Sequence, residues 1–492
     1  ALQSAENETE VIVRFTPAPR AAAAGDDPVA ALQSQAEQTR EPLVQYAEST
    51  PGVRIKETHW IANAALIEVD TDRTSLAPIA ALSGVERLHE NFAVEISSTR
   101  AQQPSSSNTV PQTTGTQSST ASTTHTQGLR QLSVPTAWET FDTKGEGATV
   151  AVLDTGVDAE NHPDLEPTQN GWKDVVNGRS EPYDNDGHGT HVSGTVVGEQ
   201  MDDGTHYGVA PEAELLHGKV LGGDGRGRFS DIVAGMEWAV THESDIDVLS
   251  MSLGNKRTDS AFIEPVRNAR ESDIVVVAAS GNEGHDTSRS PANVYDAIAV
   301  GATGENGGVM EFSSGETINN SNNWRGNAPQ DWPDKHIVPD VSAFGSFVYS
   351  AVPGGDYEPQ PGTSMATPHV AGTVALMESA TAEQLTPDEI EPALTATAWK
   401  PDGEPAAQDE RYGHGIVNAS MATAVVMDQS ANITLVSASI NDTEVLRNEP
   451  VTTTATVENT GTSSDVFTAE LRINGTVTDT RAVAVAANST ET

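Results

Sequence analysis

The chain is 492 residues long and strongly acidic, with 71 Asp and Glu against 27 Lys and Arg and a formal charge of −44. Such a charge repels phosphate, which excludes nucleic acid as a partner. The sequence contains no Cys, which excludes disulfides, thiolate catalysis and zinc–sulfur sites. No apolar run approaches the ~18–20 residues needed to cross a bilayer, so we expect no membrane span.

The charge also bears on the solvent in which the protein works. Excess negative charge destabilises a compact state by self-repulsion. Salt screens this repulsion, because the Debye length falls from about 10 Å at 0.1 M to about 3 Å at 1 M. We therefore expect a protein adapted to high salt; the alternative is an acidic secreted protein of an ordinary medium. The sequence starts at Ala1 rather than Met, and we expect a processed or truncated chain.

Residues 1–97 form the first unit. They show a β-α-β-β-α-β pattern, which predicts a small ferredoxin-like α+β domain. Pro42 is expected to kink or shorten the first helix. The expected strands are 11–15, 53–60, 65–70 and 85–96, and the expected helices are 29–47 and 76–84.

The rest of the chain divides into three further segments. Residues 98–127 are rich in Ser, Thr and Gln and predict a disordered linker. Residues 128–430 alternate apolar strands with helices, which predicts an α/β fold with a doubly wound parallel sheet and a site at the carboxyl ends of its strands. Residues 431–492 show short alternating strands and predict a partial β-sandwich module. The strands expected in the α/β segment are 148–154, 214–220, 247–253, 273–280 and 297–302.

Four polar residues of the α/β segment supply a set of catalytic groups. Asp154 ends an apolar strand, while His188 and Ser364 each begin a helix. Taken singly, each has an ordinary explanation as a turn, loop or capping residue. Together they provide a hydroxyl nucleophile, an imidazole that takes its proton and a carboxylate that orients the imidazole. Asn282 follows another strand, and its amide together with the Ser364 N–H can donate to a developing oxyanion.

The segments DTGVD, HGTHVSGT, SGNEG and GTSMATPHVAG, in this order, resemble those of the subtilisin-like serine endopeptidases, and in particular the halolysin-like secreted ones. The resemblance covers roughly residues 128–425. It implies that Asp154 orients, His188 acts as general base and then general acid, Ser364 attacks, and Asn282 binds the oxyanion. The order Asp-His-Ser and the absence of G-x-S-x-G argue against an α/β-hydrolase esterase. A catalytically silent binding protein on the same scaffold is the other alternative.

The resemblance also implies how an extended polypeptide substrate binds. Two strand edges pair with it, and exposed edges accept a peptide by β-augmentation. The side chain before the scissile bond would enter between Ser252–Gly254 and Ala278–Gly281. Because these walls are small and uncharged, we expect a medium or large apolar residue there, although a plain surface loop is the alternative. The expected contacts lie at Gly225, Arg226, Gly227, Ser252, Leu253 and Gly254.

Structural calcium is the cofactor that the resemblance implies. Asp164 in NHPDL is the expected ligand, and Asp202 with Asp203 is a further candidate pair. Carboxylate oxygens suit calcium. A chain with 71 acids also places Asp in many loops by chance.

Residues 1–97 resemble the propeptide of this family, which is a folding chaperone and a temporary inhibitor. The tail at 94–97 would lie in the active site, and the cut would fall between about Ile96 and Gln127. A permanent accessory domain is the alternative. The sequence therefore predicts a secreted, extracellular, monomeric endopeptidase, made as a self-processing zymogen that its own propeptide inhibits.

Overall fold

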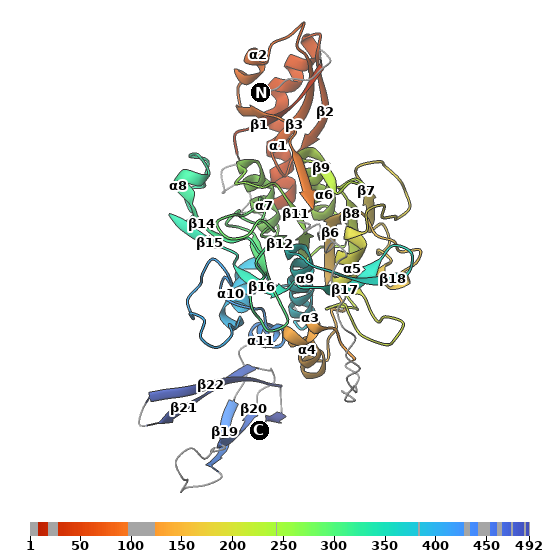
Figure 1. Cartoon of the computed structure of the whole chain (residues 1–492). Helices are drawn as coiled ribbons and strands as arrows, with labels where there is room; N and C mark the ends of the chain where they lie inside the picture. The colour runs from red at the N-terminus through yellow and green to blue at the C-terminus, as the bar shows by residue number, and fades with distance from the viewer. Residues whose placement is uncertain are drawn as a thin grey trace, which may run out of the picture.

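The computed structural model describes residues 8–17, 28–96, 124–242, 244–381, 384–427, 433–440, 453–459, 465–473, 476–486 and 489–491. These residues form an N-terminal α+β part, a large central part and a C-terminal β part (Figure 1). Of the expected linker, only residues 124–127 are among those described. No helix in the described ranges is both long and apolar enough to cross a membrane.

The N-terminal part is a four-stranded antiparallel sheet in the order β2-β3-β1-β4, with helix α1 packed on it. Alternate residues of β1 pack with Leu43 of α1 in one apolar cluster. The helix runs through Pro42 to Ser49, so the proline does not shorten it. The elements are β1 (Glu8–Phe15), α1 (Pro28–Ser49), β2 (Val53–His59), β3 (Ala64–Asp70), α2 (Leu76–Ala80) and β4 (Val85–His89).

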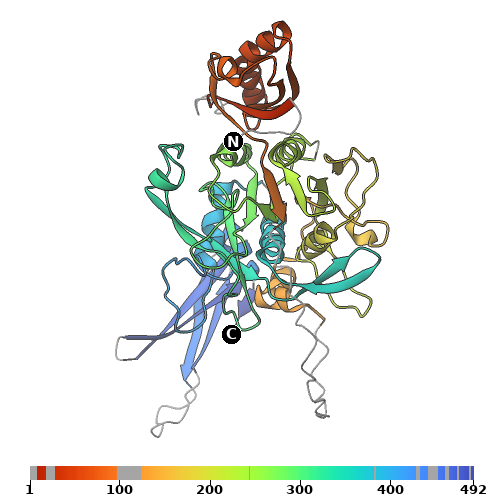
Figure 2. The same ribbon diagram turned by 45° about the horizontal axis from the view of Figure 1, so that its top comes forward.

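The last strand expected in this part, residues 85–96, is wrong in one respect: the segment forms two strands in two different sheets. β4 ends at His89, and β5 (Ala93–Ile96) begins after a break. Asn91 in the break accepts a hydrogen bond from Ser230 N at 3.1 Å and donates one to Ser230 Oγ at 2.9 Å. The neighbouring Phe92 packs on Phe229 and Phe262. These contacts hold the turn against the central part, and β5 then enters that part (Figures 1 and 2).

The central part contains a seven-stranded parallel sheet in the order β16-β13-β12-β10-β6-β8-β7. Successive residues of its inner strands belong to two different apolar clusters, so both faces are buried. This confirms the predicted α/β fold with a parallel sheet, while the edge strands β7 and β16 were not predicted. The strands are β6 (Thr149–Asp154), β7 (Trp172–Asp174), β8 (Glu214–Lys219), β10 (Val248–Met251), β12 (Val275–Ala279), β13 (Ile298–Thr303) and β16 (Val341–Phe344).

Helices cover both faces of this sheet. One face packs against α5 and α9, and the other against α6 and α7 (Figure 1). The helices are α3 (Gln127–Gln131), α4 (Val134–Phe141), α5 (His188–Val197), α6 (Phe229–Val240), α7 (Ile263–Arg270), α8 (Asn320–Asn323), α9 (Thr363–Ser379), α10 (Pro387–Thr397) and α11 (Ala419–Val426). The short strands outside the main sheet are β9 (Arg226–Arg228), β11 (Leu253–Gly254), β14 (Glu316–Asn319), β15 (Lys335–Val338), β17 (Val348–Val352) and β18 (Asp356–Gln360).

The C-terminal part consists of two small antiparallel sheets, β19-β20-β23 and β21-β22. Of its strands, β21 and β22 lie beside α11. The predicted β-sandwich stays a prediction. The strands are β19 (Ile433–Ile440), β20 (Thr453–Asn459), β21 (Asp465–Ile473), β22 (Thr476–Val485) and β23 (Ser489–Glu491).

Candidate active site

The structure brings Asp154 and His188 into contact. Asp154 is the last residue of β6, and His188 is the first residue of α5. Asp154 Oδ1 lies 2.8 Å from His188 Nδ1 and also accepts the backbone N–H of Thr155 at 2.7 Å. The exposed fraction is 0% for Asp154 and 4% for His188. The contact fixes the tautomer with a proton on Nδ1, which leaves Nε2 as the basic nitrogen.

The surroundings of His188 favour its charged form. Burial by itself lowers the pKa of the imidazole, but the charge and hydrogen bond of Asp154 raise it above its ordinary value. Asp186 and Asp184 add to this effect through their charges. His188 Nε2 is buried and has no hydrogen-bond partner within the described part of the chain. The ring is therefore held at Nδ1 and has a nitrogen available at Nε2.

Asp184, which the sequence analysis did not single out, anchors the start of α5. One carboxylate oxygen accepts the backbone N–H of Gly187 at 2.9 Å and the hydroxyl of Thr155 at 3.0 Å. The other accepts the N–H and the hydroxyl of Thr190, at 2.9 and 2.7 Å. No capping pattern pointed to Asp184, because it lies four residues before the helix rather than directly before it. Asp184 ties the loop after β6 to the helix that carries His188.

Ser364 lies in the first turn of α9, which packs against α5. Gly362, with φ +155°, precedes the helix. Ser364 Oγ donates to the carbonyl of Ser252 at 3.2 Å, and Ser252 Oγ donates to the carbonyl of Ser364 at 2.8 Å. Amides of a first helical turn have no carbonyl partner from a preceding turn. The Ser364 N–H is thus one of the backbone donors at this helix end.

Asn282 is held by the residue next to Ser364. Its Oδ1 accepts the backbone N–H of Thr363 at 3.0 Å and the Thr363 hydroxyl at 3.1 Å. These two contacts hold the side-chain amide of Asn282 beside the start of α9.

Five of the six residues expected to bind substrate flank one strand of the chain itself. β5 lies between β9 and β11 in a three-stranded antiparallel sheet. Figures 1 and 2 show this strand reaching from the N-terminal part into the central part. Ile96 N donates to the carbonyl of Gly225 at 3.0 Å. The pairs are Val94 with Gly227, Glu95 with Arg226 and Gly254, and Ile96 with Leu253, while Ser252 bonds to Ser364.

The pocket expected for the side chain before the scissile bond is not uncharged. Between the segments Ser252–Gly254 and Ala278–Gly281 lies the side chain of Arg289, paired with Glu283. Arg289 could not be placed here from the sequence, because no short-range pattern puts a residue eight positions beyond Gly281 between these two walls. The pocket is therefore partly filled and contains an ion pair.

A buried lysine behind Asp154 was also missed. Lys219 Nζ donates to Asn185 Oδ1 and to the carbonyl of Leu221, each at 2.9 Å, and to the carbonyl of Thr155. Burial lowers the pKa of this amine, while Asp184 and other nearby carboxylates oppose the shift. Lys219 thus ties together the chain segments that follow β6 and β8.

Asp164, the expected calcium ligand, has one carboxylate oxygen engaged by hydrogen donors. Its Oδ2 accepts the hydroxyl of Tyr207 at 2.6 Å and the N–H of Glu199 at 3.0 Å. Calcium at Asp164 stays a prediction. Among the described residues, the one group of three His, Cys, Asp or Glu side chains with metal-ligand proximity is His285, Asp286 and Glu410, away from Asp164. Asp202 and Asp203 are not part of it.

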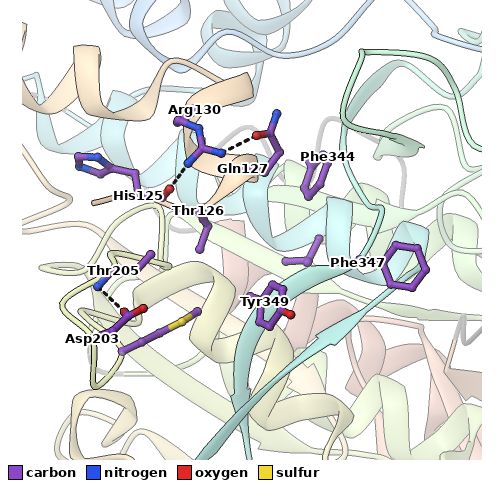
Figure 3. Close-up of a pocket in the computed structure, with 12 residues that line it drawn as sticks. His125, Thr126, Gln127, Arg130, Asp203, Thr205, Phe344, Phe347 and Tyr349 are labelled. Atoms are coloured by element: carbon purple, nitrogen blue, oxygen red, sulfur yellow. Dashed lines mark hydrogen bonds between the residues drawn. The ribbon is translucent and has the colours of Figure 1, made fainter. Parts of the chain in front are cut away.

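A cavity of about 310 Å³ lies beside α3, where the described chain resumes at residue 124 (Figure 3). Arg130 donates to the carbonyl of His125 and, at 2.6 Å, to Gln127 Oε1, so the polar groups there pair with one another. Phe344, Phe347 and Tyr349 line another side. None of the four catalytic candidates lines this cavity.

Comparison with known proteins agrees with this geometry. Residues 145–415 match the Subtilase family. The chain is 37% identical over 301 residues to subtilisin BL of Lederbergia lenta, covering 60% of this chain and 97% of that protein. It is 38% identical over 283 residues to an intracellular serine protease of Paenibacillus polymyxa, covering 56% and 79% of the two chains. Bacillopeptidase F of Bacillus subtilis is 35% identical over 331 residues, which cover 22% of that protein. The chain therefore belongs to the subtilase family and is a serine endopeptidase.

Proposed function

We propose that the chain hydrolyses peptide bonds through an acyl-enzyme formed on Ser364. Its Oγ attacks the carbonyl carbon while His188 Nε2 takes the hydroxyl proton. Asn282 and the Ser364 N–H donate to the oxygen that becomes negative. The carbon–nitrogen bond breaks as His188 returns the proton to the leaving amine. Water then hydrolyses the ester by the same proton route.

The buried contact between His188 and Asp154 supports this assignment most directly. It joins the end of β6 to the start of α5, although the two residues are 34 positions apart. The basic nitrogen that remains, Nε2, lies on a helix packed against the one that carries Ser364. Proton transfer requires Ser364 Oγ to turn from the Ser252 carbonyl toward this nitrogen.

β5 supports the proposal that substrates bind as an added strand. It occupies the position between β9 and β11 with backbone hydrogen bonds, a binding mode that is independent of side-chain identity. Val94 is completely buried in the apolar cluster beneath it. A polypeptide substrate in the same place would present its scissile bond one residue further on, after the residue that follows the equivalent of Ile96.

The same contact supports an inhibitory role for residues 1–97, which bind where a substrate would bind. The N-terminal part is further held by Arg14, which donates to the carbonyl of Ala261 at 2.7 Å, and by Ile61, whose N–H donates to Glu237 at 3.0 Å. We infer a zymogen that cuts itself within two residues after Ile96. N-terminal sequencing of the active form tests this position.

The proposal extends to the environment of the enzyme. An inhibitor built into the chain protects the cell that makes the protease, which favours a secreted, extracellular product. The charge of −44 favours a medium of high salt. Calcium as a stabilising ion and the monomeric state stay predictions.

Replacing Ser364 by Ala in the full chain tests the catalytic assignment. We expect loss of self-processing, of casein hydrolysis and of labelling by a serine-directed fluorophosphonate. Ser420→Ala is the matched control, because Ser420 is a buried serine of α11. Casein hydrolysis by the purified Ser364→Ala chain would refute the assignment.

A further inference from the structure

The side chain of Arg289 lies between two chain segments, one at Gly254 and the other at Gly281. A Cβ atom added to Gly254 would lie 2.9 Å from Arg289 Cβ and 3.3 Å from its Cδ. A Cβ atom added to Gly281 would lie 3.1 Å from Arg289 Cγ. The aliphatic stem of Arg289 therefore touches both segments that were expected to flank the side chain before the scissile bond. Only glycines leave room for it there.

The charged end of Arg289 is held in place. Its Nε donates to Glu283 Oε2 at 3.0 Å, and its Nη2 pairs with Glu283 Oε1. Nη1 lies 3.3 Å from the carbonyl oxygen of Gly254 and 3.5 Å from that of Ile96. The exposed fraction of the side chain is 2%. A guanidinium with a two-pronged carboxylate partner has a fixed orientation, so this side chain does not swing aside easily.

The charge of the guanidinium is also balanced. Glu283 pairs with it, and Glu95 Oε1 lies 3.6 Å from its Nη2. Lys256 lies close to both of these carboxylates, 2.9 Å from Glu95 and 3.6 Å from Glu283. Glu95 belongs to β5, which a substrate would replace, so an acidic substrate side chain would meet the carboxylate of Glu283 as well as the arginine. Arg289 therefore affects the pocket by occupying space in it and does not provide a free positive charge.

We propose that Arg289, held by Glu283, determines specificity by filling this pocket, so that the enzyme cleaves after small side chains such as Gly, Ala and Ser. The inference rests on the proposed function and defines its substrate class. A large apolar side chain would have to displace a buried ion pair, which would leave a carboxylate without its partner. In the sequence, β5 is followed by Ser97 and Ser98, both of which have small side chains.

Peptide p-nitroanilides of sequence Ala-Val-Glu-Ile-X test this inference, because their first four residues repeat β5. X is Ala, Ser, Leu, Phe, Asp or Lys. The full chain is allowed to process itself in high salt, and active sites are counted with the fluorophosphonate. For the wild-type chain we expect kcat/KM with X as Ala or Ser to exceed that for Leu or Phe by at least about tenfold.

Two substitutions of Arg289 separate the effect of its volume on specificity from the effect of its charge. Arg289→Ala opens the pocket, and the ratio of kcat/KM for Phe to that for Ala should rise at least about tenfold. Arg289→Met keeps most of the volume without the charge, and the preference for small residues should persist. Arg270→Met is the matched control, because Arg270 pairs with Asp388 and Glu391 outside the cleft and should leave the ratio unchanged.

The outcomes are distinct from those that test Ser364. A wild-type chain that is labelled but cleaves after Phe as well as after Ala would overturn the role of Arg289 and leave the catalytic assignment intact. If Asp were the best residue X and this preference were lost in Arg289→Met, the charge of Arg289 would determine specificity. That result would also overturn the proposal that Arg289 acts by filling the pocket. If Arg289→Ala does not fold, the wild-type and Arg289→Met profiles still decide.

Discussion

Three carboxylates act on the imidazole of His188, and they do so in different ways. Asp154 contacts the ring directly, whereas Asp184 and Asp186 raise its pKa through their charges. Burial raises the pKa of Asp186 as well, and the positive charge of His188 opposes this shift. A general base acts in its neutral form. With His188 as the proposed general base, its raised pKa should place the lower limb of the activity profile above the ordinary imidazole value of 6.5.

Asp186→Asn should move this limb to lower pH by a few tenths of a unit, since one of the charges that stabilise the imidazolium is removed. The amide keeps an acceptor for the backbone N–H of His188, which donates to Asp186 Oδ1 at 3.2 Å. The measurement is kcat/KM against pH for one peptide substrate. Asp402→Asn, in an exposed turn, serves as the control. An unmoved limb in Asp186→Asn would contradict the role of this charge.

The N-terminal part contacts the central part through more than one of its elements. β5 provides backbone pairing, while β2 ends at His59, which contacts Glu237 of α6 at 3.3 Å. Burial by itself would lower the pKa of His59, but Glu237 and Glu57 raise it to about 9. Arg40 and Lys56 are the nearby cations, close to Glu237 and Glu57. A raised pKa means that protonated His59 stabilises the docked state fully below about 6.5 and progressively less up to about 9.

His59→Gln should therefore destabilise the uncut chain most at pH 6 and hardly at all above pH 9. The difference at pH 6 is at most about 3 kcal/mol, since one pKa unit corresponds to about 1.4 kcal/mol. Thermal unfolding of Ser364→Ala chains with and without His59→Gln, from pH 6 to 9.5, measures it. His242→Gln replaces a histidine two residues after the end of α6 and is the control. A difference that does not change with pH would count against the ion pair.

Elements with a strong local pattern could be predicted from the sequence, and those decided by distant contacts could not. The apolar strand that ends at Asp154 and the helix that begins at His188 follow from residue order alone. The break at Asn91 could not be predicted, because its cause is Ser230, 139 positions away. Arg289 was missed for the same reason: its burial depends on Gly254 and Gly281 being brought to either side of it by the fold.

At the scale of the whole molecule, the dominant property is the charge of −44. Ion pairs neutralise only part of it, since 71 acidic residues face 27 Lys and Arg. The remaining repulsion acts between charges spread over the surface and is therefore sensitive to ionic strength.

The thermal midpoint of the Ser364→Ala chain should accordingly rise as NaCl increases from about 0.1 to about 4 M, because the Debye length becomes shorter than the spacing between surface charges. The inactive variant prevents self-digestion during the series. Potassium chloride should give the same trend if screening is the cause. A midpoint independent of salt would refute the adaptation to high salt.

The three-stranded sheet β9-β5-β11 has a consequence for when activity starts. While the chain is continuous, the tether fixes the local concentration of β5 at its binding site, so dilution does not empty it. Under the proposed self-cleavage after β5, the occupancy of this site by β5 then follows ordinary mass action. A dilute preparation should then become active sooner than a concentrated one. N-terminal fragments released from some molecules should bind to others and inhibit them.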